Sequence, residues 1–282
     1  MRKVAPPDGY PPEKGRYARG NDFSPVAVCV ILDTFDFTIP SELEELLMAG
    51  LDTGAALSGM LQTENIGMEK MICNIVANPN IRYIVLCGRE ASGHLPGQSL
   101  LCLMEKGVDE KRRIVESNAP TPFLFNLSDE AIERFRKQIV AVVNLLCEAG
   151  ETDRSALGLD PEVVGKAVWS CFQEEPVQFK RYTLYDMGAY PEPPLVQKVV
   201  WKASKPWELA GTHKPQKQVS ALVVYKLLPG TNCRDCGEKT CRAFASKLVQ
   251  WMRLPKDCPH LLKPDFAEER SALESLLGMQ GE

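Results

Sequence analysis

The sequence lacks both a surplus of basic residues and any long hydrophobic run. Its 33 Lys and Arg residues stand against 37 Asp and Glu, a formal net charge of -4, so a nucleic-acid partner, which demands neutralisation of phosphates, is not expected. The longest uncharged apolar runs, residues 23–32 and 139–147, are far shorter than the ~20 residues that cross a bilayer. Residues 1–20 are rich in proline, glycine and charge, unlike a secretory signal. We therefore expect a cytoplasmic protein with no membrane span.

The sequence also lacks the motifs of nucleotide-driven and hydrolytic chemistry. It has no Walker loop and no Gly-x-Gly-x-x-Gly motif, and its three histidines form no Ser-His-Asp arrangement. Ten cysteines are too few for a disulfide scaffold in 282 residues, and a reducing compartment is expected. Six of them lie in apolar stretches, where a free thiol usually behaves as a small buried hydrophobe: Cys29, Cys73, Cys87, Cys102, Cys147 and Cys171.

The length suffices for about two domains, and the first of them alternates strand and helix patterns. Continuous apolar runs at residues 25–32 and 81–87 predict strands that are covered on both faces. Helical patterns lie at residues 41–48, 64–76, 96–106 and 131–147, and a short strand pattern lies at 113–115. Residues 1–20 are then an N-terminal extension, and residues 21–150 form a doubly wound α/β domain with a mainly parallel sheet.

The remainder of the chain is predicted to be an ordered connector, residues 151–218, and a small domain, residues 219–282. The connector holds one helical pattern at 161–172 and a candidate strand at 196–202, and its two tryptophans argue against plain disorder. In the small domain, the pattern indicates a short strand at 221–225 and helices at 239–252 and 265–277.

The other four cysteines fall within 26 residues, in the spacing Cys233-x2-Cys236-x4-Cys241-x16-Cys258. Thiolates this close in sequence are typical of a metal site. A zinc site more often shows two Cys-x2-Cys hooks, whereas the unequal gaps and the proline that follows the last cysteine suit an iron-sulfur cluster. We therefore predict a 4Fe-4S cluster on these four cysteines, with zinc or unliganded thiols as the alternatives.

The residues around the cysteines extend this prediction. The segments Leu228-Pro229-Gly230-Thr231-Asn232-Cys233 and Thr240-Cys241-Arg242-Ala243-Phe244-Ala245 resemble the cluster domain of the large subunit of the corrinoid iron-sulfur protein, over about residues 219–262. In that family the cluster passes one electron to a corrinoid cobalt that has fallen to the inactive Co(II) state. The resemblance implies the same low-potential task here, which lies within the range of cluster potentials.

A glycine-rich loop follows the strand predicted at residues 81–87. It reads Gly88-Arg89-Glu90-Ala91-Ser92-Gly93-His94-Leu95-Pro96-Gly97-Gln98. Ligands of doubly wound sheets bind at this position, beyond the carboxyl ends of the strands. His94 taken alone is more often a surface or hydrogen-bonded residue than a ligand. The flanking glycines favour ligation, because they let a bulky ring system approach the backbone closely.

Longer motifs in the first domain resemble the A-type subunit of tetrahydromethanopterin S-methyltransferase, from Gly15 to about Gln138. They include Thr63-Glu64-Asn65-Ile66-Gly67-x-Glu69-Lys70, Asn78-Pro79-Asn80-Ile81-Arg82-Tyr83 and Cys87-Gly88-x-Glu90-x-x-Gly93-His94-x-x-Gly97-Gln98-Ser99. In that family a Rossmann-like domain binds a corrinoid, and the histidine that matches His94 is the lower axial ligand of cobalt. The resemblance implies that His94 is the cobalt ligand here. The other residues implied to contact the cobalamin-type corrinoid are Thr63, Glu64, Asn65, Gly88, Gly93, Gly97 and Gln98, and a helix cap is the alternative role for residues 63–65.

Two features of the sequence depart from the family pattern. Residues 116–122 replace a glycine-rich stretch of the family, and the family's membrane anchor is not expected, so sodium pumping is not implied. The sequence also differs from the Asp-x-His-x-x-Gly box of other corrinoid domains, because Ser92 holds the Asp position. A carboxylate at that spacing would orient the imidazole and raise its basicity. Glu90 is the candidate substitute.

Both resemblances name the same cofactor, so the sequence predicts a soluble corrinoid iron-sulfur methyl carrier, a component of a corrinoid-dependent methyltransferase system. Co(I) would accept a methyl group from a methyltetrahydrofolate or methyltetrahydromethanopterin methyltransferase and deliver it to a methyl-acceptor enzyme. The 4Fe-4S cluster, supplied by a low-potential electron donor, would return Co(II) to Co(I). The alternatives are a 4Fe-4S redox protein that activates a separate corrinoid methyltransferase and a zinc-stabilised interaction protein.

Overall fold

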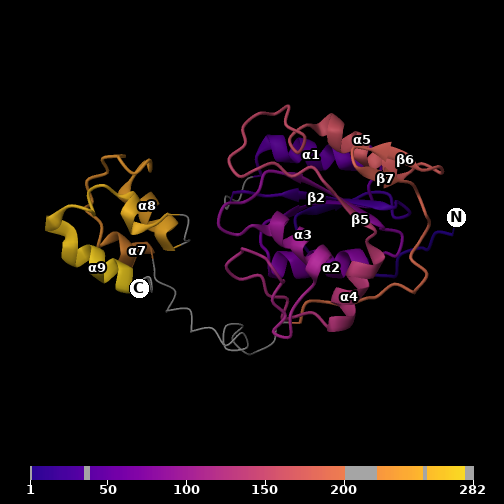
Figure 1. Cartoon of the computed structure of the whole chain (residues 1–282), viewed down its shortest axis with the longest axis horizontal. Coiled ribbons are helices and arrows are strands. Elements are labelled where there is room, and N and C mark those ends of the chain that lie inside the picture. The colour runs from indigo at the N-terminus through magenta and orange to yellow at the C-terminus, as the bar shows by residue number, and fades with distance from the viewer. Residues whose placement is uncertain (1, 35–38, 201–220, 250–252, 277–282) are drawn as a thin grey trace. The chain divides into compact units, whose positions relative to one another are not determined.

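The computed structural model describes residues 2–34, 39–200, 221–249 and 253–276. The chain forms two compact units, Met1–Ala203 and Ser204–Glu282 (Figure 1). Within the described residues, no helix is long and apolar enough to cross a membrane.

A five-stranded sheet organises the first unit, in the strand order β1-β3-β2-β4-β5. The strands β3, β2, β4 and β5 run parallel to one another, and β1 pairs with β3 at the edge in antiparallel orientation. The structure therefore confirms an α/β fold with a mainly parallel sheet. The elements in chain order are β1 Tyr17–Arg19, β2 Val26–Ile31, α1 Ser41–Asp52, β3 Leu57–Leu61, α2 Ile66–Val76, β4 Tyr83–Gly88, α3 Pro96–Lys106, α4 Asp129–Gln138, β5 Ala141–Asn144, α5 Pro161–Cys171, β6 Val177–Phe179 and β7 Tyr182–Leu184.

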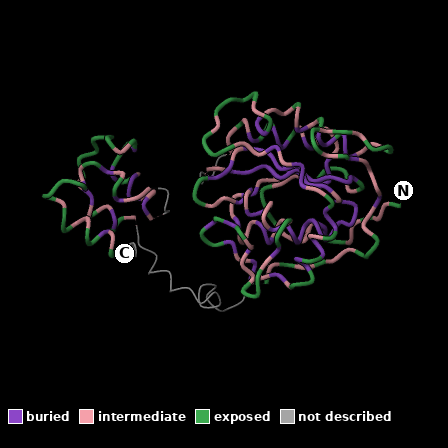
Figure 2. The backbone as a smooth tube through the Cα atoms, viewed as in Figure 1, coloured by how far each residue is buried: buried purple, intermediate pink, exposed green. Residues whose placement is uncertain are grey.

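Helices cover both faces of this sheet, which explains the continuous apolar runs of its two central strands. α1 and α5 lie on one face and α2, α3 and α4 on the other (Figure 1). Every residue of β2 and β4 is buried, and these strands form the purple centre of the unit in Figure 2. Alternate side chains of β2 enter two separate cores: Ala27 and Cys29 pack on the α2 side, and Val28 and Val30 on the α1 side.

The predicted long helix at residues 131–147 is confirmed up to Gln138 and is wrong beyond it. α4 ends at Gln138, and residues 141–144 form β5, which pairs in parallel with β4. The β-branched run after Gln138 suits a strand, and pairing with β4 decided between the two conformations. Gln138 fixes the helix end, because its buried Nε2 donates hydrogen bonds to the carbonyls of Ile75, Asn78 and Ile81 at 3.0, 2.9 and 3.1 Å.

Two short strand predictions also differ from the structure. Residues 113–115 form only isolated bridges and no strand. Residues 196–200 have no regular secondary structure, although Leu195 and Val199 pack against the α2-side core, and residues 201–202 lie outside the described part of the chain. The helix predicted at 161–172 is confirmed as α5, and it contributes Val164, Ala167, Val168 and Cys171 to the same core as α1.

The second unit is small and mostly helical. Its elements are α7 Ala221–Tyr225, α8 Cys241–Val249, η1 Pro255–Asp257, η2 Pro264–Phe266 and α9 Ala267–Leu276. The predicted strand at 221–225 is wrong, because this segment is a short helix whose Val224 is buried with Phe244, Leu248 and Leu273. The helices predicted at 239–252 and 265–277 are confirmed over α8 and α9, apart from residues 250–252 and 277, which lie outside the described residues.

We predict that Gln138→Ala lowers the free energy of unfolding by about 1–3 kcal/mol, because it removes the buried hydrogen bonds from Nε2 to three backbone carbonyls. Urea unfolding measures the change. Gln178→Ala is the matched control, since Gln178 is exposed and bonds only Thr183 at 2.8 Å, and we expect its effect to stay within about 0.5 kcal/mol. Equal effects of the two substitutions would contradict this role of Gln138.

Candidate functional sites

The His94 loop lies at the carboxyl end of the sheet. β4 ends at Gly88 and α3 begins at Pro96, so the loop follows one of the two central strands. The chain leaves β2 toward β3 on one side and leaves β4 toward β5 on the other. Neighbouring parallel strands whose connections diverge in this way open a crevice at their carboxyl ends, where ligands of α/β proteins bind.

A fully buried carboxylate holds the His94 ring. Nδ1 of His94 lies 2.8 Å from Oε2 of Glu64, whose side chain is 0% exposed while that of His94 is 29% exposed. The other oxygen of Glu64 accepts hydrogen bonds from the Thr121 hydroxyl at 2.8 Å and from the Thr121 backbone N–H at 3.1 Å. Three loops therefore meet at one carboxylate, and they follow β3, β4 and α3.

These hydrogen bonds set the charge of Glu64. Burial works to raise the pKa of its carboxyl, but the hydrogen bonds from His94 and Thr121 outweigh burial and lower this pKa below its usual range. Glu64 is therefore an anion at neutral pH. A carboxylate on Nδ1 fixes the ring orientation and tautomer and raises the basicity of Nε2, the nitrogen that would bind a metal.

The prediction that the Glu90 carboxylate orients His94 is wrong. Glu90 accepts hydrogen bonds from the backbone N–H groups of Ala91, Gly97 and Gln98 at 2.9, 3.2 and 2.6 Å, so it caps the start of α3 and does not orient His94. Burial raises the pKa of its carboxyl, and these N–H groups counteract the rise. Glu64 lies 30 residues before His94, so no local spacing in the sequence could have identified it.

Residues 63–65 have different roles. Asn65 is the N-cap of α2, and its side chain accepts from the Ile66 N–H at 2.7 Å and donates to the Thr121 hydroxyl at 3.0 Å. The Thr63 hydroxyl accepts from the Gly67 N–H at 3.0 Å. Both residues therefore hold backbone N–H groups at the start of α2, and Asn65 is its N-cap. Sequence reasoning missed Thr121, which lies in residues 116–122, where the sequence departs from the family pattern.

The glycines of the loop also have different roles. A Cβ on Gly88 would lie 2.9 Å from the Ile31 carbonyl oxygen, and one on Gly97 would lie 2.4 Å from Leu146. The close backbone therefore requires a glycine at position 88, whereas a Cβ at position 97 would require shifts of the Leu146 and Glu90 side chains. A Cβ on Gly93 would meet no atom within 4 Å, and its φ is +90°, so the backbone beside His94 is open on that side. The Gln98 side chain accepts from the Asn118 N–H at 3.0 Å.

In the second unit, the four clustered cysteines line one cavity together with Asn232 and Phe244. Cys241 begins α8 and Cys258 follows η1, and both are buried, whereas Cys236 is half-buried and Cys233 is exposed. Asn232 connects the loop to the helix: its side-chain oxygen accepts from the Cys241 N–H at 2.8 Å, and its own N–H lies 3.4 Å from the Cys241 sulfur. Four convergent thiols and an N–H that points at sulfur fit an iron-sulfur cluster.

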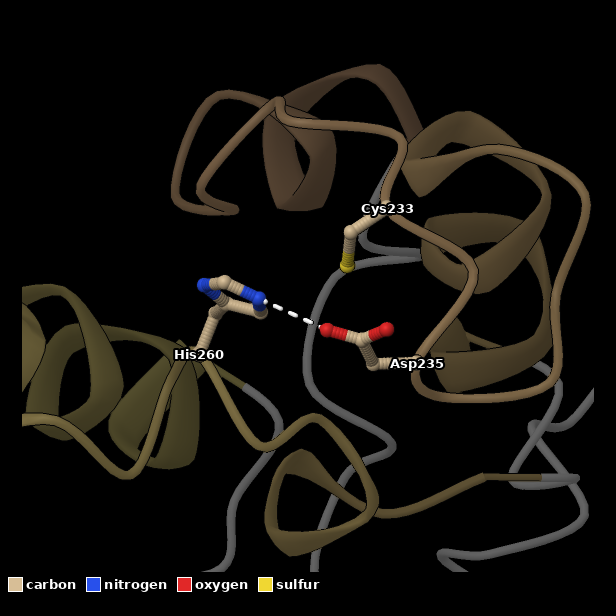
Figure 3. Close-up of side chains that lie close together, drawn as sticks. All are labelled: Cys233, Asp235 and His260. Carbon is tan, nitrogen blue, oxygen red and sulfur yellow. Dashed lines mark hydrogen bonds and ion pairs between the residues drawn. The ribbon is translucent and has the colours of Figure 1, made fainter.

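Asp235 and His260 lie beside the exposed cysteine of this group. Figure 3 shows their side chains directed toward each other below Cys233, and Nε2 of His260 lies 2.9 Å from Oδ2 of Asp235. Hydrogen bonds from His260 and from the Cys233 thiol lower the pKa of the Asp235 carboxyl. One ligand atom from each of the three residues lies within 4.8 Å of the others. Sequence reasoning did not bring Asp235 or His260 into the site, because the two residues are 25 positions apart.

Two families of known proteins match the chain, one in each unit. Residues 3–166 match the MtrA family, the A-type subunits of tetrahydromethanopterin S-methyltransferase, and residues 228–260 match a family described as an Fe-S cluster. The chain is 36% identical to A-type subunit 1 of tetrahydromethanopterin S-methyltransferase from Methanothermobacter marburgensis over 181 residues, which are 64% of this chain and 67% of that protein. It is 35% identical to A-type subunit 2 of the same enzyme from Methanothermobacter thermautotrophicus over 200 residues, 71% of this chain and 91% of that protein. The chain therefore belongs to the family of A-type tetrahydromethanopterin S-methyltransferase subunits and carries an additional Fe-S cluster segment.

Proposed function

We propose that the chain is a corrinoid iron-sulfur methyl carrier. The observation that carries the proposal is the buried Glu64 carboxylate on Nδ1 of His94 at the carboxyl end of the sheet, 2.8 Å away. When bound, a corrinoid supplies a cobalt that accepts a methyl group and gives it up, and a 4Fe-4S cluster supplies single electrons at low potential.

The first unit would hold the corrinoid. Nε2 of His94 would bind the cobalt, and Glu64 would keep that nitrogen basic and correctly oriented. Thr121 and Asn65 would hold Glu64 in place, since both contact the same junction of loops. The open backbone beside Gly93 gives a large ring system room to approach. A methyltetrahydrofolate or methyltetrahydromethanopterin methyltransferase would donate the methyl group, and a separate methyl-acceptor enzyme would take it.

The second unit would hold the cluster on Cys233, Cys236, Cys241 and Cys258. The buried cysteines would shield the cluster from water, and the exposed Cys233 would leave one corner close to the surface. Electrons from a low-potential protein donor would enter at this corner, and the cluster would return cobalt that has been oxidised to Co(II) to the active Co(I) state. The alternative function, activation of a separate corrinoid methyltransferase, would leave His94 without a cobalt.

We predict that His94 supplies a nitrogen ligand of the cobalt. Paramagnetic resonance of the corrinoid-loaded Co(II) protein should show superhyperfine coupling to one nitrogen, and labelling the histidines with ¹⁵N should convert each triplet into a doublet. His94→Ala should lose this coupling while the fold survives, because the residue lies in a loop. Coupling that does not respond to the label would show that a corrinoid base, and not His94, binds cobalt.

We predict that Glu64→Gln weakens ligation by His94 about 10–100-fold, because the neutral amide no longer raises the basicity of the ring. The Co(II)/Co(I) midpoint potential should shift to more positive values, which spectroelectrochemistry measures. Glu69→Gln is the matched control: Glu69 is 1% exposed and accepts from Asn126 at 2.7 and 2.8 Å. An equal shift of the potential in both variants would contradict a specific role of Glu64.

We predict that Cys236→Ser separates methyl transfer from reactivation. Corrinoid binding and methylation of chemically reduced Co(I) should remain, because His94 and the cysteines belong to different units. Recovery from Co(II) with a low-potential protein donor should become slow or vanish. Cys102→Ser is the matched control, since Cys102 is also half-buried and lies outside the cluster. Reactivation of Cys236→Ser at the wild-type rate would show that the cluster is not the entry point for electrons.

A further inference from the structure

A cavity lies between α2 and the β1 edge of the sheet, and neither His94 nor the cysteines of the cluster line it. The cavity has a volume of about 280 Å³. Its floor is apolar and is made by side chains of β2, β3, β4 and α2: Ala27, Cys29, Leu57, Leu61, Ile75 and Ile84. Protein interiors normally pack as densely as organic crystals. A space of this size with an apolar floor therefore has the character of a ligand pocket.

Small residues create the cavity. On the α2 side of β2, positions 27 and 29 carry an alanine and a cysteine, although both belong to an otherwise close-packed core. α2 carries Gly67 where it faces the cavity, and a Cβ there would lie 2.9 Å from the Thr63 hydroxyl. On the opposite face of the same strand, Val28 and Val30 fill their core.

Cations form the rim of the cavity. Lys14 and Arg16 are exposed, Lys70 is half-buried, and all three line the opening. In the described part of the chain no ion pair engages any of them, and Lys70 Nζ donates to the Lys14 carbonyl at 3.3 Å. An apolar floor below three cations suits a ligand that joins an apolar ring to an anionic group.

The cavity adjoins the His94 site through one loop. Thr63 lines the cavity, and the next residue, Glu64, holds His94. A ligand that extends from the neighbourhood of His94 along this loop would reach the cavity. Two such ligands exist in the proposed chemistry: the nucleotide tail of a corrinoid, a benzimidazole ring with a phosphate, and a pterin methyl donor, a fused ring with carboxylates. Ligation of cobalt by His94 would leave the benzimidazole ring free of the metal.

We propose that this cavity binds a heterocyclic ring that carries an anionic group, with Lys14, Arg16 and Lys70 holding the anion and the space beside Ala27 and Cys29 holding the ring. The assignment of the ligand rests on the proposed corrinoid function. The corrinoid tail and the pterin share the chemistry that the cavity recognises, and the two are separated by their binding to variants of the cavity.

The test compares hydroxocobalamin, cobinamide, which lacks the nucleotide tail, and methyltetrahydrofolate, each in equilibrium dialysis with the full chain. The variants are Cys29→Leu, which fills the cavity, and the triple variant Lys14→Ala, Arg16→Ala, Lys70→Ala. If the tail is the ligand, both variants should weaken hydroxocobalamin binding by about tenfold or more and leave cobinamide binding unchanged. If the pterin is the ligand, methyltetrahydrofolate binding should fall in the same way.

Unchanged affinities for hydroxocobalamin and methyltetrahydrofolate in both variants would overturn the proposal. Loss of cobinamide binding in His94→Ala, with wild-type behaviour of the cavity variants, would leave the proposed function intact and overturn only the cavity. Failure of the wild-type chain to bind any corrinoid would overturn the proposed function itself, and methyltetrahydrofolate binding would still test the cavity.

Two controls exclude a loss of fold or a general loss of charge. Cys87→Leu adds the same atoms to the opposite, close-packed core, where Cys87 is 0% exposed, and should lower the melting temperature by several degrees. Cys29→Leu should leave the melting temperature unchanged or raise it, because the cavity accepts the added atoms. Lys166→Ala removes a cation from α5 on the other face of the sheet and should change no affinity.

Discussion

The hydrogen bond between Nδ1 of His94 and the buried carboxylate of Glu64 is the interaction on which the first unit's site depends. A carboxylate that is 0% exposed costs free energy unless it is paired and hydrogen-bonded. His94 and Thr121 together satisfy it, and they come from loops that meet only because the parallel strands β3, β2 and β4 end at one edge of the sheet. The fold therefore fixes the positions of these loops relative to one another.

The central elements of the fold followed from local pattern. The runs at residues 25–32 and 81–87 became β2 and β4, because only strands covered on both faces read as continuous apolar sequence. The apolar run at 139–147 suits helix or strand, and only its pairing with β4 makes part of it a strand. The segment at 221–225 is ambiguous in the same way, and packing against Phe244 of the second unit favours a helix there.

The residues of the two sites also differ in whether a local sequence signal identifies them. The four cysteines stood out because their spacing is a local signal, and His94 stood out through motifs that resemble a known family. Their partners did not, because contacts between Glu64 and Thr121, or between Asp235 and His260, join residues 57 and 25 positions apart. The local sequence signal of the apolar cavity beside α2 is weak, because it consists of an alanine and a cysteine within an apolar strand. A single sequence identifies reactive groups, whereas the fold determines what orients them.

Metal content tests the central claim most directly, that one chain carries a corrinoid on His94 and a cluster on its four cysteines. We predict that protein purified without oxygen from cells that make corrinoids contains about one cobalt and four iron atoms per chain, with the visible spectra of both chromophores. Stoichiometric zinc without iron would contradict the cluster, and iron without cobalt would contradict the carrier and leave a redox protein in its place.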